Sequence, residues 1–442
     1  MSTPAQPDNT EEKGAVTRQG SAKLTVRQAA FIGVGAMVGA GIFSLLGPAG
    51  EIAGSAVWVS FLIAGAIAGL QGYSFAKFGA RFPTAGGLLE YVQKAYGDGH
   101  FTGIIAWLIY ATNIVVTAMV AISFGSYASE MFTDGAAVWL KAFAVLVIIV
   151  MSLLNVAGSK AVAHAQTVVV IVVMGSLTVF AVATLANIEP GFLAPADYPP
   201  FSDLVASVAL TFFAFLGFGV ITFTAKDLAN PSRQLPRAVF VALGIATAIY
   251  VAIALGVFGT LPVDEVVAAG ATAIAVAAEP ILGNLGFWMM SITALFATAG
   301  ATNAGLYPAT GLADELASDG QFPPLMAARS GKVPNGLLFT ALGSAGLVLA
   351  FDLTAVASIG SAIALIVFTL ITAGHIRVRG DTGAQAWLLV LGVLSSGIVL
   401  FAFAFTTLVD EPGTAIAMLV FLLLSIVIDF LWKRRRARTV TA

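Results

Sequence analysis

Long apolar runs alternate with short polar segments along almost the whole chain. A helix needs about 20 mostly apolar residues to cross a bilayer, and about twelve runs approach or exceed that length. They cover approximately residues 26–50, 54–80, 100–131, 136–155, 160–186, 203–225, 236–260, 284–309, 334–351, 353–375, 385–407 and 413–432. Pro and Gly occur inside several runs, which bundled membrane helices tolerate because neighbours satisfy the freed backbone groups. The pattern predicts an all-α polytopic membrane protein.

The polar segments between the runs indicate how the chain is divided. Residues 1–23 are polar and mixed in charge, and we expect a disordered cytoplasmic tail there. Residues 24–432 form the predicted membrane-spanning domain, and 433–442 form a basic cytoplasmic tail. The segment 82–97 is amphipathic, which predicts a short surface helix, and 262–283 predicts a short outer helix over a vestibule.

Composition excludes most other protein classes. Hydrophobic residues make up 59% of the chain and charged residues only 10%, whereas a soluble domain carries about 25% charged residues. Lipid must therefore be the main solvent. There are no cysteines, and His100, His164 and His375 lie far apart. We therefore expect no disulfide, metal site or cofactor, and no nucleic-acid partner.

The basic residues predict the orientation in the membrane. With an even number of spans, both tails lie on one side. Of the 21 Lys and Arg residues, only Lys141 falls on the other side, and Lys160 lies at or inside a span. The opposite loops are acidic, with Asp264 and Glu265 among their residues. By the positive-inside rule both termini are cytoplasmic, in a multi-pass plasma-membrane protein.

Glycines interrupt two of the predicted spans. The first contains Gly33, Gly35, Gly39 and Gly41, and the sixth contains Gly217 and Gly219. Glycine is a poor helix former, so both spans are candidates for local unwinding. Interrupted helices at corresponding positions of two five-helix halves point to a binding site at the membrane midplane. Their free N–H groups and carbonyls suit the carboxylate and the ammonium of an amino acid.

A second interpretation of the same glycines stays open. Gly35 and Gly39 form a small-xxx-small pair, which is a common device for packing membrane helices closely. A dinucleotide-binding fingerprint is excluded, because the glycine spacing is wrong and no βαβ unit can surround it.

Five short motifs give the chain a family resemblance. They are Gly39-Ala40-Gly41-Ile42-Phe43, Gly158-Ser159-Lys160-Ala161-Val162, Phe215-Leu216-Gly217-Phe218-Gly219, Asn230-Pro231-Ser232-Arg233-Gln234-Leu235-Pro236 and Leu261-Pro262-Val263-Asp264-Glu265. In this order and spacing the chain resembles the amino acid–polyamine–organocation transporters. Within them it is similar to the prokaryotic proton-coupled transporters of the cationic-amino-acid-transporter type.

The resemblance implies a fold and a binding site. The fold is a LeuT-like five-plus-five inverted repeat, here 24–187 and 202–376, followed by two extra helices in 384–432. The substrate carboxylate is implied to bind the backbone N–H groups of Gly39, Ala40, Gly41 and Ile42. The ammonium is implied to bind carbonyls near Phe215, Leu216 and Phe218, with Phe213 as an aromatic gate. The chain departs from many relatives after the sixth span, where Lys226-Asp227 replaces two acids.

Lys160 is the implied proton carrier. In the resembling branch a lysine of the fifth span occupies the space that sodium occupies in other members, beside the residues corresponding to Gly35 and Thr298. An ammonium supplies the charge and donors that sodium would supply, and a buried ammonium can lose its charge near neutral pH. The alternative is that Lys160 snorkels to the membrane surface at a helix end.

The predicted function is secondary active transport of L-amino acids by alternating access, coupled to protons and independent of sodium. An amino-acid exchanger and a polyamine permease on the same fold remain alternatives. An ion channel is more distant, because no repeated filter or charged ring is visible. An enzyme is not expected, because no cluster of catalytic side chains is present near an interface.

Overall fold

The structure, a computed structural model, describes residues 23–83, 87–157, 160–410 and 412–440. The expected tail at 1–23 thus falls almost entirely outside the described residues. The helices of the first part are α1 (Val26–Met37), α2 (Ala40–Ser44), α3 (Leu46–Ala53), η1 (Gly54–Ala56), α4 (Val57–Arg81), α5 (Leu88–Tyr96), α6 (His100–Thr133), α7 (Ala137–Ala157), α8 (Lys160–Leu185), η2 (Pro190–Leu193) and η3 (Pro195–Asp197).

The second part continues the helical pattern and adds one small hairpin. Its elements are α9 (Phe201–Phe212), η4 (Phe213–Asp227), α10 (Pro231–Phe258), α11 (Val263–Ala269), η5 (Gly270–Thr272), α12 (Ala273–Ser318), α13 (Pro324–Ala327), β1 (Arg329–Ser330), β2 (Val333–Pro334), α14 (Asn335–Ala350), α15 (Leu353–Thr382), α16 (Ala386–Asp410) and α17 (Pro412–Val440). The basic segment after Trp432 thus continues α17 as helix up to Val440.

The protein is an all-α polytopic membrane protein. Eleven helices within the described residues are long and apolar enough to cross a membrane. The remaining predicted span, 334–351, which is the ninth in chain order, corresponds to α14, which has only 16 residues. At 1.5 Å per residue α14 is about 24 Å long, less than the hydrocarbon core of roughly 30 Å. The flanking Pro334 and Phe351 are extended at its two ends, which limits its length.

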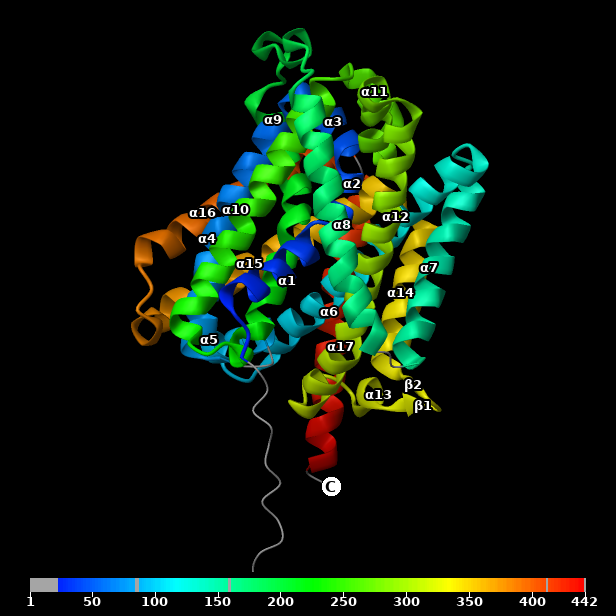
Figure 1. Cartoon of the computed structure of the whole chain (residues 1–442). Helices are drawn as coiled ribbons and strands as arrows, with labels where there is room; N and C mark the ends of the chain where they lie inside the picture. The colour runs from blue at the N-terminus through cyan, green and yellow to red at the C-terminus, as the bar shows by residue number, and fades with distance from the viewer. Residues whose placement is uncertain (1–22, 84–86, 158–159, 411, 441–442) are drawn as a thin grey trace, which may run out of the picture.

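The two halves of the chain interleave rather than forming separate bundles. Helix α10 packs along α4, α12 packs along α6, and α1 lies against both α10 and η4. Both ends of the described chain lie at the same end of the molecule, the lower end in Figure 1. There the backbone N–H of Leu24 donates to the carbonyl of Asp227 over 2.9 Å.

Helix α5 is the surface helix that the segment 82–97 predicted. One face buries Leu89, Tyr91 and Val92, and Tyr91 stacks on Phe78 of α4 with ring centroids 4.9 Å apart. The Tyr96 hydroxyl donates to the carbonyl of Leu370 on α15 over 2.7 Å. Burial raises the pKa of this phenol, so it remains a donor at neutral pH. Helix α5 is therefore fastened to the ends of α4 and α15.

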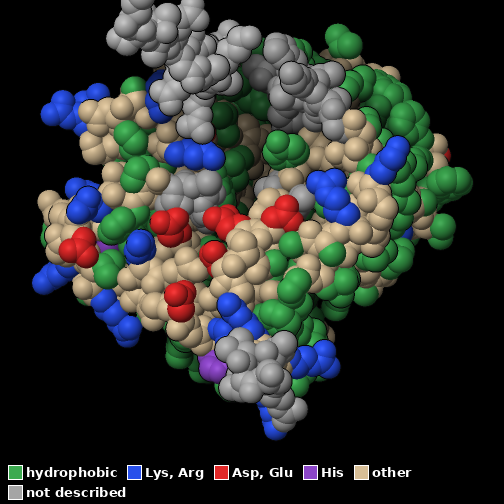
Figure 2. All heavy atoms as spheres, turned by 90° about the horizontal axis from the view of Figure 1, so that it is seen from below, with side chains coloured by type: hydrophobic (Ala, Val, Ile, Leu, Met, Phe, Trp, Pro, Cys, Tyr) green, Lys and Arg blue, Asp and Glu red, His purple; other side chains and the backbone are tan. Residues whose placement is uncertain are grey.

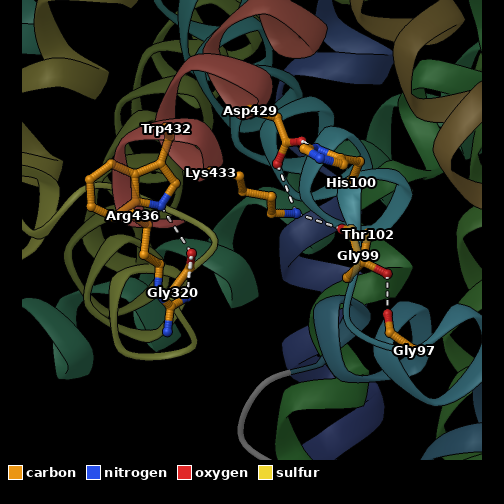
Figure 3. Close-up of polar contacts among 9 residues, drawn as sticks. All are labelled: Gly97, Gly99, His100, Thr102, Gly320, Asp429, Trp432, Lys433 and Arg436. Carbon is orange, nitrogen blue, oxygen red and sulfur yellow. Dashed lines mark hydrogen bonds and ion pairs between the residues drawn. The ribbon is translucent and has the colours of Figure 1, made fainter. Parts of the chain in front are cut away.

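The end of α17 fastens two neighbouring loops at the same face. Asp429 is fully buried, and its carboxylate lies 2.6 Å from His100 Nδ1 and 3.0 Å from Lys433 Nζ (Figure 3). Lys433 also donates to the carbonyl of Gly99 over 2.6 Å. On the same helix, Trp432 and Arg436 both donate to the carbonyl of Gly320, each over 3.0 Å. These contacts tie α17 to the start of α6 and to the loop after α12.

Gly103 makes room for this cluster. A β-carbon at that position would overlap the Asp429 carboxylate and approach Lys433 Nζ to 2.6 Å. We predict that Gly103→Ala destabilises the protein by about 1–3 kcal/mol, because the ion pair must move out of a packed site. Thermal unfolding in detergent would measure the loss.

The matched control is Gly175→Ala in α8, where a β-carbon meets nothing within 4 Å. An exposed helical Gly→Ala change should be neutral or slightly stabilising. Equal melting temperatures for Gly103→Ala and wild type would contradict the packed cluster.

Candidate functional site

The first span is interrupted at Val38 and Gly39. Helix α1 ends at Met37, Gly39 has φ −148° and ψ −109°, and α2 begins at Ala40. The first N–H groups of a helix lack acceptors within that helix. The N–H groups of Ala40, Gly41 and Ile42 are in this position, whereas the N–H of Gly39, the fourth residue of the implied carboxylate site, donates to the Met37 carbonyl over 2.9 Å. The Ala40 side chain lies outside the described residues.

The sixth span changes helix type where its glycines predicted an interruption. Helix α9 ends at Phe212, and residues Phe213–Asp227 form the 3₁₀ helix η4. Stretches of 3₁₀ helix longer than three or four residues are uncommon and often mark a hinge. The interruption is therefore a change of helix type rather than the unwinding that we expected.

Two glycines let the first and sixth spans touch through their backbones. A β-carbon on Gly41 would overlap Ala214 of η4. A β-carbon on Gly217 would overlap the carbonyl of Ala36 and approach the Met37 nitrogen to 2.6 Å. Gly41 itself is α-helical and has no positive φ, so close approach and not backbone freedom requires glycine there. Gly41 therefore allows close packing of the two spans beside the interruption.

The aromatic side chains of η4 hold it in place from three directions. Phe213 is 4% exposed, and its ring would lie 2.6 Å from a β-carbon on Gly360 of α15. Phe215 packs edge-on against Tyr250 of α10, with centroids 5.1 Å apart. The ring centroid of Phe218 lies 5.4 Å from the ring centroid of Phe75 and 5.4 Å from that of Phe368. Leu216 is only partly buried.

Two buried tyrosines bind backbone carbonyls of the interrupted spans, and sequence reasoning missed both. The Tyr250 hydroxyl donates to the Ala214 carbonyl over 3.0 Å, and the Tyr127 hydroxyl donates to the Phe43 carbonyl over 3.1 Å. Ser44 also pairs with Ser123 of α6. The only sequence signal for Tyr250 and Tyr127 is that each places a single hydroxyl within an apolar predicted span, where it needs a hydrogen-bond partner.

The residues of the implied cation position are only partly brought together. Gly39 faces α12, where a β-carbon would lie 2.9 Å from Ala301 and 3.8 Å from the Ala297 carbonyl. Thr298 is fully buried beside them, and its hydroxyl donates to the Ala294 carbonyl over 2.6 Å. The Thr298 oxygen keeps its lone pairs for a further donor.

Gly35 faces α8, but at Val170, whose Cγ2 would lie 2.8 Å from a β-carbon. Lys160 begins that helix ten residues earlier, about 15 Å along its axis. The side chain of Lys160 lies outside the described residues, as do Gly158 and Ser159. The contact observed on Gly35 is therefore with the middle of α8 and not with its first turn.

Comparisons with known proteins agree with this architecture. The model of the family described as amino acid permease matches residues 24–436. The chain is 33% identical over 380 residues to an uncharacterized protein of Methanocaldococcus jannaschii, covering 84% of this chain and 87% of that one. It is 31% identical over 408 residues to the inner membrane transport protein YbaT of Escherichia coli, covering 92% and 95%. It is 28% identical over 381 residues to a vacuolar cationic amino acid transporter of Arabidopsis thaliana, covering 80% and 59%.

Gly41→Val should abolish ligand binding while the protein stays folded, because the added side chain separates the first span from Ala214. We expect loss of ligand-dependent thermal stabilisation and a cost of roughly 1–3 kcal/mol in stability. Gly244→Val on the exposed face of α10, where a β-carbon meets nothing within 4 Å, is the matched control. Full binding by Gly41→Val would show that this contact is not needed by the site.

Proposed function

We propose that this chain, which belongs to the amino acid permease family, is a secondary transporter that takes up L-amino acids by alternating access. The observation that carries the proposal is the pair of interrupted spans in backbone contact at Gly41 and Gly217. Free N–H groups at the start of α2 suit a carboxylate, and carbonyls of η4 suit an ammonium. The α1–α2 turn and the 3₁₀ helix η4 are the hinges that we propose for alternating access.

The side chains around the interruption favour a neutral substrate. Ile42, Phe43, Phe213 and Phe215 are buried there, and all are apolar. Within the described residues, Asp429 is the one buried acid, and it is paired with His100 and Lys433 far along the chain. The second charge of arginine, lysine or a polyamine would have no counter-ion at the site. An unpaired buried charge costs several kcal/mol, which excludes tight binding.

The proposed membrane is the plasma membrane, with both termini in the cytoplasm. The support is the excess of Lys and Arg in the segments on the terminal side, together with the common position of both chain ends in the fold. Lys160 is proposed as the proton carrier. Because Gly35 contacts Val170, this role requires the first turns of α8 to approach α1 in another state of the transport cycle.

The substrate class can be measured with purified protein by ligand-dependent thermal stabilisation. Small neutral L-amino acids should stabilise the protein, whereas lysine and arginine should bind at least about 100-fold more weakly, as a difference near 3 kcal/mol implies. Amines that lack the carboxylate should compete poorly. Stabilisation by a polyamine and by no amino acid would overturn the carboxylate assignment to Gly39–Ile42.

Coupling can be measured in liposomes that contain the purified transporter. Uptake should rise as the outside is acidified and should need no sodium gradient. Lys160→Ala should stop the response to the pH gradient, because it removes the exchangeable proton. Lys160→Arg should also stop it, because a guanidinium keeps its charge near neutral pH.

The two variants separate charge from proton exchange. Recovery of coupled uptake by Lys160→Arg alone would show that a fixed charge is enough. Sodium-driven uptake, or an intact pH response in Lys160→Ala, would mean that Lys160 only anchors the helix at the membrane surface. Ligand binding by both variants serves as the control for folding.

A further inference from the structure

A cavity of about 360 Å³ lies at the foot of α7, α12 and α14, apart from the interrupted spans. Its lining includes Asn155 at the end of α7, Tyr307 on α12 and Leu337 at the start of α14. The other wall is the β1–β2 hairpin, which contributes Arg329, Lys332 and Pro334. In Figure 1, α7 and α14 stand at one edge of the molecule with the hairpin at their lower end.

The hairpin fixes the backbone that carries its two basic residues. Arg329 pairs with Pro334 and Ser330 with Val333, so the loop has only two residues, and its Gly331 has φ 66°. Such a positive φ suits the first position of a tight hairpin turn. Asn335 fixes the hairpin from behind: its N–H donates to the Ala328 carbonyl over 2.9 Å, and its side-chain amide donates to the Leu325 carbonyl over 2.8 Å.

The charge of the cavity is positive. No acid lines it, and neither Arg329 nor Lys332 forms an ion pair with a described residue. The carbonyl end of α7 and the N–H end of α14 carry about half a charge each, of opposite sign, and offset one another. Two full cations remain. The side-chain amide of Asn155 already donates to the Met151 carbonyl and to Asn303, so it adds no free donor.

A second cavity on the same face has the opposite character. It measures about 490 Å³ and is lined by Glu90, Asp98, Glu315 and Asp319 with a single lysine, Lys94. Figure 2 shows acidic side chains gathered toward the middle of this face, beside a hollow, and Lys and Arg side chains mainly toward its rim. The two cavities therefore differ in charge, because acids dominate the lining of this one, whereas the cavity at the hairpin is lined by two cations and no acid.

Apolar surface leads away from the basic cavity along the helices above it. On α12, Trp288, Ile292 and Phe296 follow at four-residue spacing and are 40–57% exposed, and Tyr307 lies three helical turns beyond. On α7, Leu153 and Val150 are 63% and 41% exposed. A ligand that fits both parts has an anionic head and apolar chains.

We propose that this cavity binds the headgroup of an anionic phospholipid. The phosphate lies between Arg329 and Lys332, at the N-terminal end of α14, and the acyl chains follow α7 and α12. The Tyr307 ring, 75% exposed, lies at the boundary between headgroup and chains, where aromatic residues are enriched. Basic pockets at the cytoplasmic ends of membrane helices bind such headgroups.

The test is lipid binding to the full-length protein in a neutral detergent, measured by native mass spectrometry with phosphatidylglycerol and with phosphatidylcholine. Wild type should retain phosphatidylglycerol in preference to phosphatidylcholine. The double variant Arg329→Gln/Lys332→Gln should bind phosphatidylglycerol about 30-fold more weakly, since each cation contributes roughly a factor of five near an anionic surface.

The matched control is Arg233→Gln/Arg237→Gln, which removes the same charge from the exposed start of α10 and should bind like wild type. An equal loss in the control would show that only overall charge matters and would overturn the site. A separate arm adds inorganic phosphate at millimolar concentration. Displacement of the lipid by phosphate alone, with the same dependence on Arg329, would assign the cavity to a soluble anion instead.

Discussion

The backbone contact between the first and sixth spans is the constraint on which the rest of the site depends. At Gly41 and Gly217 the two spans are closer than any β-carbon would allow. The α-helical hydrogen bonding of both spans is interrupted near these contacts. In the first span a turn at Gly39 interrupts it, and in the sixth span a 3₁₀ helix replaces it. Backbone N–H groups and carbonyls that a continuous membrane helix would pair internally are therefore left available at this point.

Neutral side chains, and not charged ones, stabilise the backbone at the two interruptions. Tyr250 and Tyr127 donate to carbonyls next to the interruptions, and the rings of Phe215 and Phe218 are inserted between neighbouring helices. In the proposed site the recognition groups are mostly backbone, so the side chains around it would select by size and by the absence of a counter-ion.

Several charged groups lie apart from the interrupted spans, at the end of the molecule that holds both ends of the described chain. Asp429 fastens α17 to the start of α6, acids surround the inner cavity near α5, and the hairpin cations lie at the edge of the bundle. The two environments differ in solvent. The acids line one cavity, and in the proposed lipid site the hairpin cations face an anionic headgroup. The same end of the protein can therefore contact substrate solution and lipid through opposite charges.

The sequence alone determined the class of fold, because a chain with 59% hydrophobic residues and long apolar runs has no soluble alternative. It also located both interruptions, since clustered glycine weakens a helix wherever the helix is placed. Only the tertiary structure decided why Gly41 and Gly217 must be glycine, because the atoms that exclude a β-carbon lie more than 170 residues away in sequence for both. It also shortened α14, replaced an expected unwinding by a 3₁₀ helix, and set Val170 rather than the start of α8 against Gly35. Each of these depends on distances between helices, which are fixed by packing across the whole bundle and leave no local pattern in the chain.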